Sequence, residues 1–195
     1  MLILCMDTSH KYMGIALLNE NSVIAQKSVD CFKKQSENLL PEADALLKEN
    51  GFVPKDIDAI CISRGPGSYT GVRIAMTVAK TLGALAGVQV YTLSSLRLFS
   101  GGKKGVTLLD ARSHRAYVGA YLEETYEGIM DLDEVKEKYG NAQFFADGAL
   151  IGKEDLYLPI GECFLSNRPY WEEVSNIHSL VPDYFRGNEG YKTLL

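Results

Sequence analysis

One glycine-rich segment of the chain has the composition of an anion-binding loop. The segment SRGPGSYTGVR, residues 63–73, holds three glycines and a proline and runs directly into a helix start. When such a turn follows a strand, free backbone amides meet the positive end of the helix dipole, and both attract a phosphate. Three roles remain open: anion contact, docking of a partner, or a close chain reversal in which Ser68 or Thr70 caps the helix.

Two common phosphate-binding motifs do not fit this loop. A P-loop needs Gly-Lys-Ser or Gly-Lys-Thr, and this chain has Gly71-Val72-Arg73 in that place. A dinucleotide fingerprint needs an acidic residue about 20 positions further on, and residues 59–109 contain no Asp or Glu. The same acid-free stretch carries several basic residues, of which Arg64 and Arg73 flank the loop and form a candidate basic cluster.

The pattern of apolar residues predicts the elements that position this loop. Short apolar or alternating runs predict strands, and apolar residues spaced three or four apart predict helices. The first helix has Ser36 as its expected N-cap and Gly51 just after its end. The predicted order is strand, strand, strand, helix, strand, helix and strand, at residues 2–7, 14–19, 23–29, 36–50, 57–63, 71–87 and 88–93. This order is typical of a mixed sheet with an antiparallel edge and a parallel centre.

The chain repeats its opening pattern after a glycine-rich linker at residues 100–105. Residues 108–122 resemble residues 5–18: a strand ends in Asp, Ser-His and a basic residue follow, and a glycine begins a second strand. The match needs two single-residue gaps, so chance similarity is the alternative to duplication. Duplication predicts a first lobe over residues 1–102 and a reduced second lobe over 103–195. The further elements predicted for the second lobe are a helix at residues 131–140, a strand at 143–148 and a terminal helix at 175–188 that is interrupted at Pro182.

The two helices of the first half carry a candidate interaction surface. Small residues recur on one face of the second helix from Gly71 to Ala86, which lets another helix approach closely or lets the helix pack on its own sheet. The first helix has an apolar stripe of its own. The predicted interface consists of Leu39, Leu40, Ala43, Leu46, Leu47, Val72, Ala75, Met76, Ala79, Leu82 and Gly83.

Composition excludes several classes of protein. A net charge of −5 argues against a chain that grips nucleic acid alone, since such binding depends on Lys and Arg neutralising phosphates. The four cysteines form no Cys-x-x-Cys pair, and His10, His114 and His178 lack metal-ligand spacing. The N-terminus has no signal-peptide pattern and no segment reads as a membrane span, so we expect a cytoplasmic protein.

Several short motifs together resemble the TsaB (YeaZ) family. They are MDTS at the end of the first strand, LLP in the first helix, SRGPGSYTGVRIAM, LSSL at 93–96, DAR at 110–112 and PDYFR at 182–186. The resemblance runs through the chain and is strongest over residues 1–112. It implies an α/β fold with the two lobes of actin, sugar kinases and Hsp70, built from duplicated ribonuclease-H-like halves of which the second is reduced here.

The resemblance also implies a function and partners. Members of this family are non-catalytic scaffold subunits that bind and activate the catalytic paralogue TsaD. With TsaE they take part in threonylcarbamoylation of the adenosine beside the tRNA anticodon. For this chain the resemblance implies a TsaD-like and a TsaE-like partner, with tRNA reached only through the complex. Docking would use the helices at 36–50 and 70–86, and a homodimer through the same helices is expected when the partner is absent.

No intrinsic cofactor or metal is expected from the resemblance. Asp7, Thr8 and Ser9 resemble a phosphate loop of the kinase superfamily, in which the carboxylate orients a hydrated metal and the hydroxyls donate to a phosphate. The second half has Ala111 and Arg112 where the matching turn needs glycine. Weak binding of ATP or ADP is therefore the most that this resemblance implies for a cofactor.

A different class of function remains as an alternative. An ATP-dependent small-molecule kinase or a degenerate peptidase would act alone, through Asp7, Asp110 and the basic cluster. His10 and His114 follow the two aspartates, and we expect them to be exposed turn residues unless they face one another between the lobes.

Overall fold

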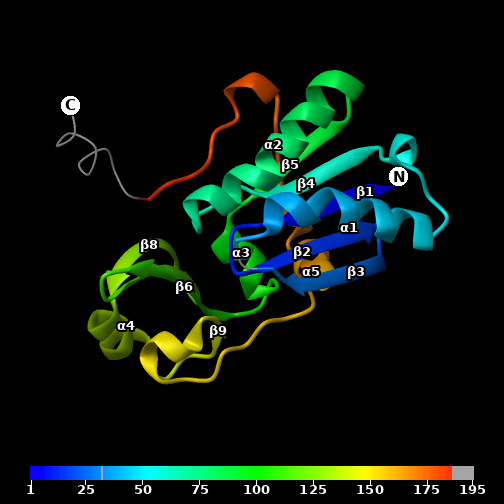
Figure 1. Ribbon diagram of the computed structural model, residues 1–195. Coiled ribbons are helices and arrows are strands. Elements are labelled where there is room, and N and C mark those ends of the chain that lie inside the picture. Colours follow the sequence, from blue (N-terminus) through cyan, green and yellow to red (C-terminus); the bar gives the residue numbers. More distant parts are fainter. Residues whose placement is uncertain (32, 186–195) are drawn as a thin grey trace, which may run out of the picture.

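The computed structural model describes residues 1–31 and 33–185, which fold into two lobes, each built on its own sheet (Figure 1). The sheet of the first lobe has the strand order β10-β5-β4-β1-β2-β3. β1 (Ile3–Asp7), β2 (Tyr12–Leu18) and β3 (Val23–Asp30) are antiparallel neighbours, whereas β4 (Ala59–Ser63) and β5 (Gln89–Leu93) continue from β1 in parallel. The predicted mixed sheet is confirmed.

Helices cover both faces of this sheet, because the side chains of β1 alternate between two apolar layers. Leu4 and Met6 lie in a core beneath α1 (Gln35–Glu49) and α2 (Tyr69–Ala86). Ile3 and Cys5 point the other way, into a core closed by α3 (Ser95–Ser100) and α5 (Ile160–Ser166). The two helices of the first half therefore share one face of the sheet.

The second lobe repeats the topology of the first. Its strands lie in the order β8-β7-β6-β9, with β6 and β7 antiparallel, β7 and β8 antiparallel, and β6 and β9 parallel. β4-β1-β2-β3 of the first lobe has the same order and directions. The elements of the second lobe are β6 (Gly105–Arg112), β7 (Arg115–Tyr121), β8 (Thr125–Asp131), α4 (Leu132–Tyr139) and β9 (Phe144–Ala146). The shared topology supports duplication rather than chance similarity.

The C-terminal part of the chain returns to the first lobe, which corrects the predicted boundary. α5 packs against β2 and β3 (Figure 1). β10 (Glu172–Glu173) pairs antiparallel with β5. These residues fell within the second lobe of the prediction because their distant partners leave no trace in the local pattern. Short 3₁₀ turns complete the described elements at Pro54–Asp56, Gly148–Ile151, Arg168–Tyr170 and Ile177–Ser179.

Two local predictions were wrong. The terminal helix over 175–188 is absent as far as residue 185, apart from the 3₁₀ turn, and 186–188 lie outside the described residues. The carbonyls of His178 and Leu180 accept hydrogen bonds from the Lys80 ammonium, which ties this segment to α2. α1 begins one residue before Ser36, and its N-cap is Lys34, without a side-chain cap.

Of the two predicted caps of α2, Ser68 and Thr70, the structure has Ser68. The Ser68 hydroxyl accepts a hydrogen bond from the Gly71 amide at 3.2 Å, which satisfies one of the free donors of the first turn. Gly87 ends the helix in the left-handed conformation that suits glycine. Within the described ranges, no helix is both long and apolar enough to cross a bilayer.

Candidate functional site

The glycine loop packs against the turn that follows β1. A Cβ atom added at Gly71 would lie 2.1 Å from the Thr8 carbonyl oxygen, and one added at Gly67 would lie 2.5 Å from the Ser9 carbonyl oxygen. The Ser68 amide donates to that Ser9 oxygen at 2.8 Å. The glycines are therefore needed for backbone to approach backbone, and of the three predicted roles the geometry supports a close chain reversal.

The three residues predicted as a phosphate loop are occupied within the protein. Asp7, Thr8 and Ser9 are at most 2% exposed. The Thr8 hydroxyl donates to the Gly71 carbonyl at 2.6 Å and accepts from the Ala75 amide at 3.1 Å, which pins the first turns of α2. These hydrogen bonds hold the loop against the turn that follows β1, and the predicted contact with a phosphate stays a prediction.

Asp7 is a buried carboxyl at the centre of this arrangement. Its Oδ1 accepts hydrogen bonds from the Ser9 amide and hydroxyl and from the Ser63 hydroxyl. Burial raises the pKa of Asp7 above its ordinary value, and the hydrogen bonds from Ser63 and Ser9 only partly oppose that rise. Its Oδ2 is buried without a hydrogen-bond partner among the described residues. Among the described residues, Asp7 belongs to no group of three or more side chains spaced to hold a metal ion.

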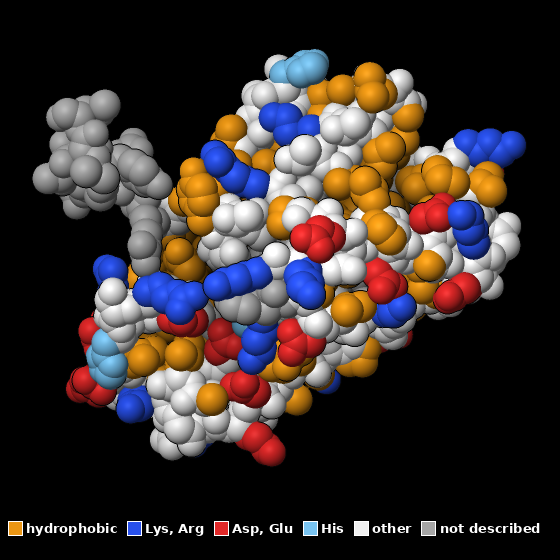
Figure 2. Space-filling view, in the orientation of Figure 1, with side chains coloured by type: hydrophobic (Ala, Val, Ile, Leu, Met, Phe, Trp, Pro, Cys, Tyr) orange, Lys and Arg blue, Asp and Glu red, His pale blue; other side chains and the backbone are white. Residues whose placement is uncertain are grey.

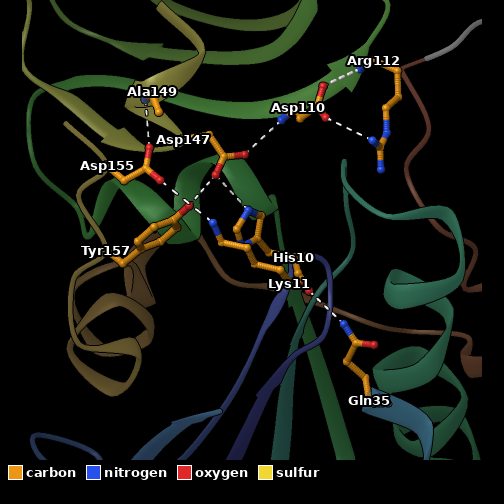
Figure 3. A network of polar contacts seen from close by, with 9 residues as sticks. All are labelled: His10, Lys11, Gln35, Asp110, Arg112, Asp147, Ala149, Asp155 and Tyr157. Carbon is orange, nitrogen blue, oxygen red and sulfur yellow. Dashed lines mark hydrogen bonds and ion pairs between the residues drawn. The ribbon is translucent and has the colours of Figure 1, made fainter. Parts of the chain in front are cut away.

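A second polar site joins the two lobes and is shown in Figure 3. His10, from the first lobe, places its Nε2 3.0 Å from Oδ1 of Asp147, which follows β9 in the second. The Tyr157 hydroxyl donates to the same oxygen, and the Asp110 amide donates to Oδ2 at 3.1 Å. One carboxylate thus ties together three segments that are far apart in the sequence.

The surroundings of the two histidines differ. The His10 side chain is only 11% exposed and packs against Phe99 and Tyr157, so the prediction of an exposed turn residue was wrong for it. His114 is 57% exposed, as expected, and lies 3.3 Å from Asp133. Each histidine has its own acidic partner, so the two do not face one another.

The pKa of the Asp147 carboxyl lies below its ordinary value. Burial works to raise its pKa, but hydrogen bonding and charge from His10, together with bonds from Tyr157 and the Asp110 amide, outweigh burial and lower it. A carboxyl whose pKa is lower in the folded state than in the unfolded state contributes its full stabilisation at pH values above the unfolded pKa. That contribution is lost as the pH falls through the folded value.

This shift predicts a pH-dependent effect of Asp147→Asn. We expect the variant to be less stable than the wild type at neutral pH, and the difference to shrink below about pH 4, where the carboxyl protonates. Urea unfolding of both proteins at a series of pH values measures the difference directly, since all other groups titrate in both. A difference that stays constant down to about pH 3 contradicts the assignment.

Most of the predicted interface residues lie in the protein's own core. Eight side chains are 6% exposed or less, so they cannot contact a partner, and the prediction was wrong for them: Leu39, Ala43, Leu46, Leu47, Val72, Ala75, Met76 and Ala79. Gly83 packs against Ile177 of the returning C-terminal segment. Leu40 remains 55% exposed, and Leu82 is half-buried. The small-residue stripe thus serves packing on the sheet.

The two arginines of the candidate basic cluster have separate surroundings. Arg64 forms an ion pair with Glu172 and lies 3.8 Å from Asp183, both in the returning segment. Arg73 is exposed, and its guanidinium carbon lies 4.6 Å from the centre of the Tyr69 ring. Arg64 therefore helps to hold the C-terminal segment rather than forming a joint anion site with Arg73.

Comparison with known proteins places the chain in a family. A family model described as "TsaD: tRNA N6-adenosine threonylcarbamoyltransferase" matches residues 27–139, more than half of the chain. The tRNA threonylcarbamoyladenosine biosynthesis protein TsaB of Bacillus subtilis is 29% identical over 95% of this chain and 94% of its own length. The chain belongs to the TsaB (YeaZ) type of this family. The TsaB protein of Escherichia coli is 33% identical over 70% of this chain and 61% of its own.

A solved structure agrees with the TsaB-type fold. The crystal structure of a Pseudomonas aeruginosa protein, described as uncharacterized with similarity to peptidase YEAZ, has a TM-score of 0.78 and 24% identity. The match covers 95% of this chain and 99% of that one. The resemblance drawn from the MDTS and SRGPGSYTGVRIAM motifs is confirmed, as is the actin-like and ribonuclease-H-like fold with two sheets.

Proposed function

We propose that this chain is a non-catalytic scaffold subunit that binds and activates a TsaD-like catalytic subunit in threonylcarbamoylation of tRNA. The curated TsaB relatives carry tRNA threonylcarbamoyladenosine biosynthesis in their names. The observation that carries the scaffold role is that Asp7, Thr8 and Ser9 are buried and hydrogen-bonded within the protein, which argues against their use on a substrate. A TsaE-like ATPase would join the same complex, and tRNA would be bound through the assembly.

The docking surface that we propose is the outer side of α1 and α2. Apolar side chains gather over these helices on the face shown in Figure 2. Leu85 is 83% exposed and Leu40 is 55% exposed, and Ile74, Val78 and Leu82 are half-buried. Exposed apolar side chains that are grouped in this way are typical of protein interfaces. The same surface would form a homodimer when the TsaD-like partner is absent.

A single charge on this surface is expected to weaken the complex. Leu85→Glu puts a carboxylate at the most exposed of the large apolar side chains among the described residues, and we expect at least a tenfold loss of affinity for the TsaD-like subunit, or about 1.4 kcal/mol. Leu122→Glu, at a 40% exposed leucine just after β7, is the matched control. Calorimetric titration of the TsaD-like subunit measures both. Equal affinities for Leu85→Glu and the control would contradict docking on α2.

A further inference from the structure

A polar cavity of about 310 Å³ opens where the two lobes and the returning segment meet. Its walls come from the ends of β4 and β5, from α3, from β8 and from residues 169–172. The carboxyl ends of parallel strands are where α/β sheets most often bind ligands. The cavity is large enough for a small metabolite. It is separate from the docking surface proposed on α1 and α2.

Two arginines and two glutamates line this cavity, and only one of each is paired. Arg64 forms an ion pair with Glu172, so these two charges neutralise one another. Among the described residues, no ion pair joins Arg97 or Glu127 to any group. Both side chains are half-buried, where an unpaired charge is costly. One positive and one negative group thus remain for a ligand.

Arg97 is held ready to bind a carboxylate. Its guanidinium carbon lies 3.8 Å from the centre of the Tyr121 ring and 4.2 Å from that of the Tyr170 ring. Stacking between two rings fixes the plane of the guanidinium and leaves its edge, with the N–H donors, open to an acceptor. An arginine in this state can donate two parallel hydrogen bonds to a carboxylate.

Glu127 is held ready to bind an ammonium group. The Tyr121 hydroxyl donates to its Oε1 at 2.5 Å and the Ser94 hydroxyl donates to its Oε2 at 2.8 Å. Burial and the neighbouring Glu127 raise the pKa of Tyr121, which keeps that hydroxyl protonated as a donor. Each carboxylate oxygen retains a lone pair for a further donor.

We propose that this cavity binds a small zwitterion of the α-amino acid class, with its carboxylate on Arg97 and its ammonium on Glu127. A simple anion would meet repulsion from Glu127, and a simple cation would meet repulsion from Arg97. Only a ligand with both charges satisfies both groups. The site needs neither the TsaD-like partner nor tRNA, so it can be tested on the isolated chain.

The chain contains its own reporter for this site. Trp171 is the only tryptophan in the sequence and it lines the cavity. Its indole nitrogen is buried and has no hydrogen-bond partner among the described residues. Its nuclear magnetic resonance signal can therefore be followed without assigning the rest of the spectrum.

Titration of the full chain with glycine, acetate and methylammonium tests the proposal. We expect glycine to shift the Trp171 indole signal saturably, and acetate and methylammonium each to bind at least about tenfold more weakly, since each lacks one charge-assisted contact. No shift with glycine overturns the proposal. Acetate binding as tightly as glycine also overturns it, because the site would then be a simple anion site.

Matched variants locate the ligand. We expect Arg97→Gln and Glu127→Gln each to weaken glycine binding about tenfold, and Arg115→Gln and Glu124→Gln, at exposed positions outside the cavity, to leave it unchanged. Unchanged backbone amide signals outside the cavity show that each variant is folded. Glu127→Gln retains the shape of the side chain, so full glycine affinity in that folded variant overturns the proposal.

Discussion

Gly71→Ala is expected to destabilise the protein by about 3 kcal/mol, the upper end of the usual cost of overpacking. The new methyl group would lie 2.1 Å from the Thr8 carbonyl oxygen, which is backbone and cannot turn aside. Relief requires α2 to move away from the turn after β1, which stretches the bonds from the Thr8 hydroxyl to Gly71 and from Ala75 to Thr8. The loss is measured as the free energy of unfolding in urea.

Helix propensity alone predicts the opposite sign. Alanine is favoured over glycine within a helix by about 1 kcal/mol, so a stabilised Gly71→Ala protein would show that the close contact is absent. Gly87→Ala is a useful control at the other end of α2. Among the described residues, no atom lies within 4 Å of a Cβ added at Gly87, so only its left-handed φ of +67° opposes alanine, at a cost of about 1 kcal/mol.

Asp147→Ala is expected to cost about 3 kcal/mol, since removing one partner from a buried charged network leaves the others without compensation. The variant leaves His10, the Tyr157 hydroxyl and the Asp110 amide without their shared acceptor. Because these groups lie in different lobes, we also expect the two lobes to unfold less cooperatively. Urea unfolding followed by two probes, one in each lobe, measures both effects.

Asp110→Ala is the matched control for the lobe junction. The Asp110 side chain is exposed, and its hydrogen bond and ion pair both join it to Arg112 of its own turn, so its loss should cost less than about 1 kcal/mol. Its backbone amide still donates to Asp147 in the variant. Equal losses for Asp147→Ala and Asp110→Ala would show that the carboxylate of Asp147 does not join the lobes.

The first lobe was largely predictable because its elements have strong local patterns. The run at residues 2–7 is apolar at nearly every position, which is typical of a strand buried on both faces, and β1 is such a strand. Ser68 stands just before an apolar helical run and caps α2. The interaction surface was harder to predict, because small residues suit a helix packed on its own sheet as well as one that meets a partner. Ala75 and Ala79 proved to face the sheet.

The features that were missed depend on contacts between distant parts of the chain. α5 is seven residues long, which is too short to show a helical period in the sequence. It packs against β2 and β3, which lie more than a hundred residues earlier in the chain. β8 also escaped prediction, because its sequence TYEGIMD mixes polar and apolar residues without regular alternation. His10 is enclosed by side chains that include one from the second lobe, and no pattern around residue 10 reveals them.

The return of the chain to its first sheet has a consequence for biosynthesis. Ile3, Cys5 and Cys61 are shielded in part by Ile160, Cys163 and Phe164, which leave the ribosome last among these residues. While the polypeptide is being made, the amino-terminal half therefore carries an apolar surface that nothing later in the chain has yet reached. A nascent intermediate of this kind is prone to aggregate, and chaperones are suited to shelter it until synthesis ends.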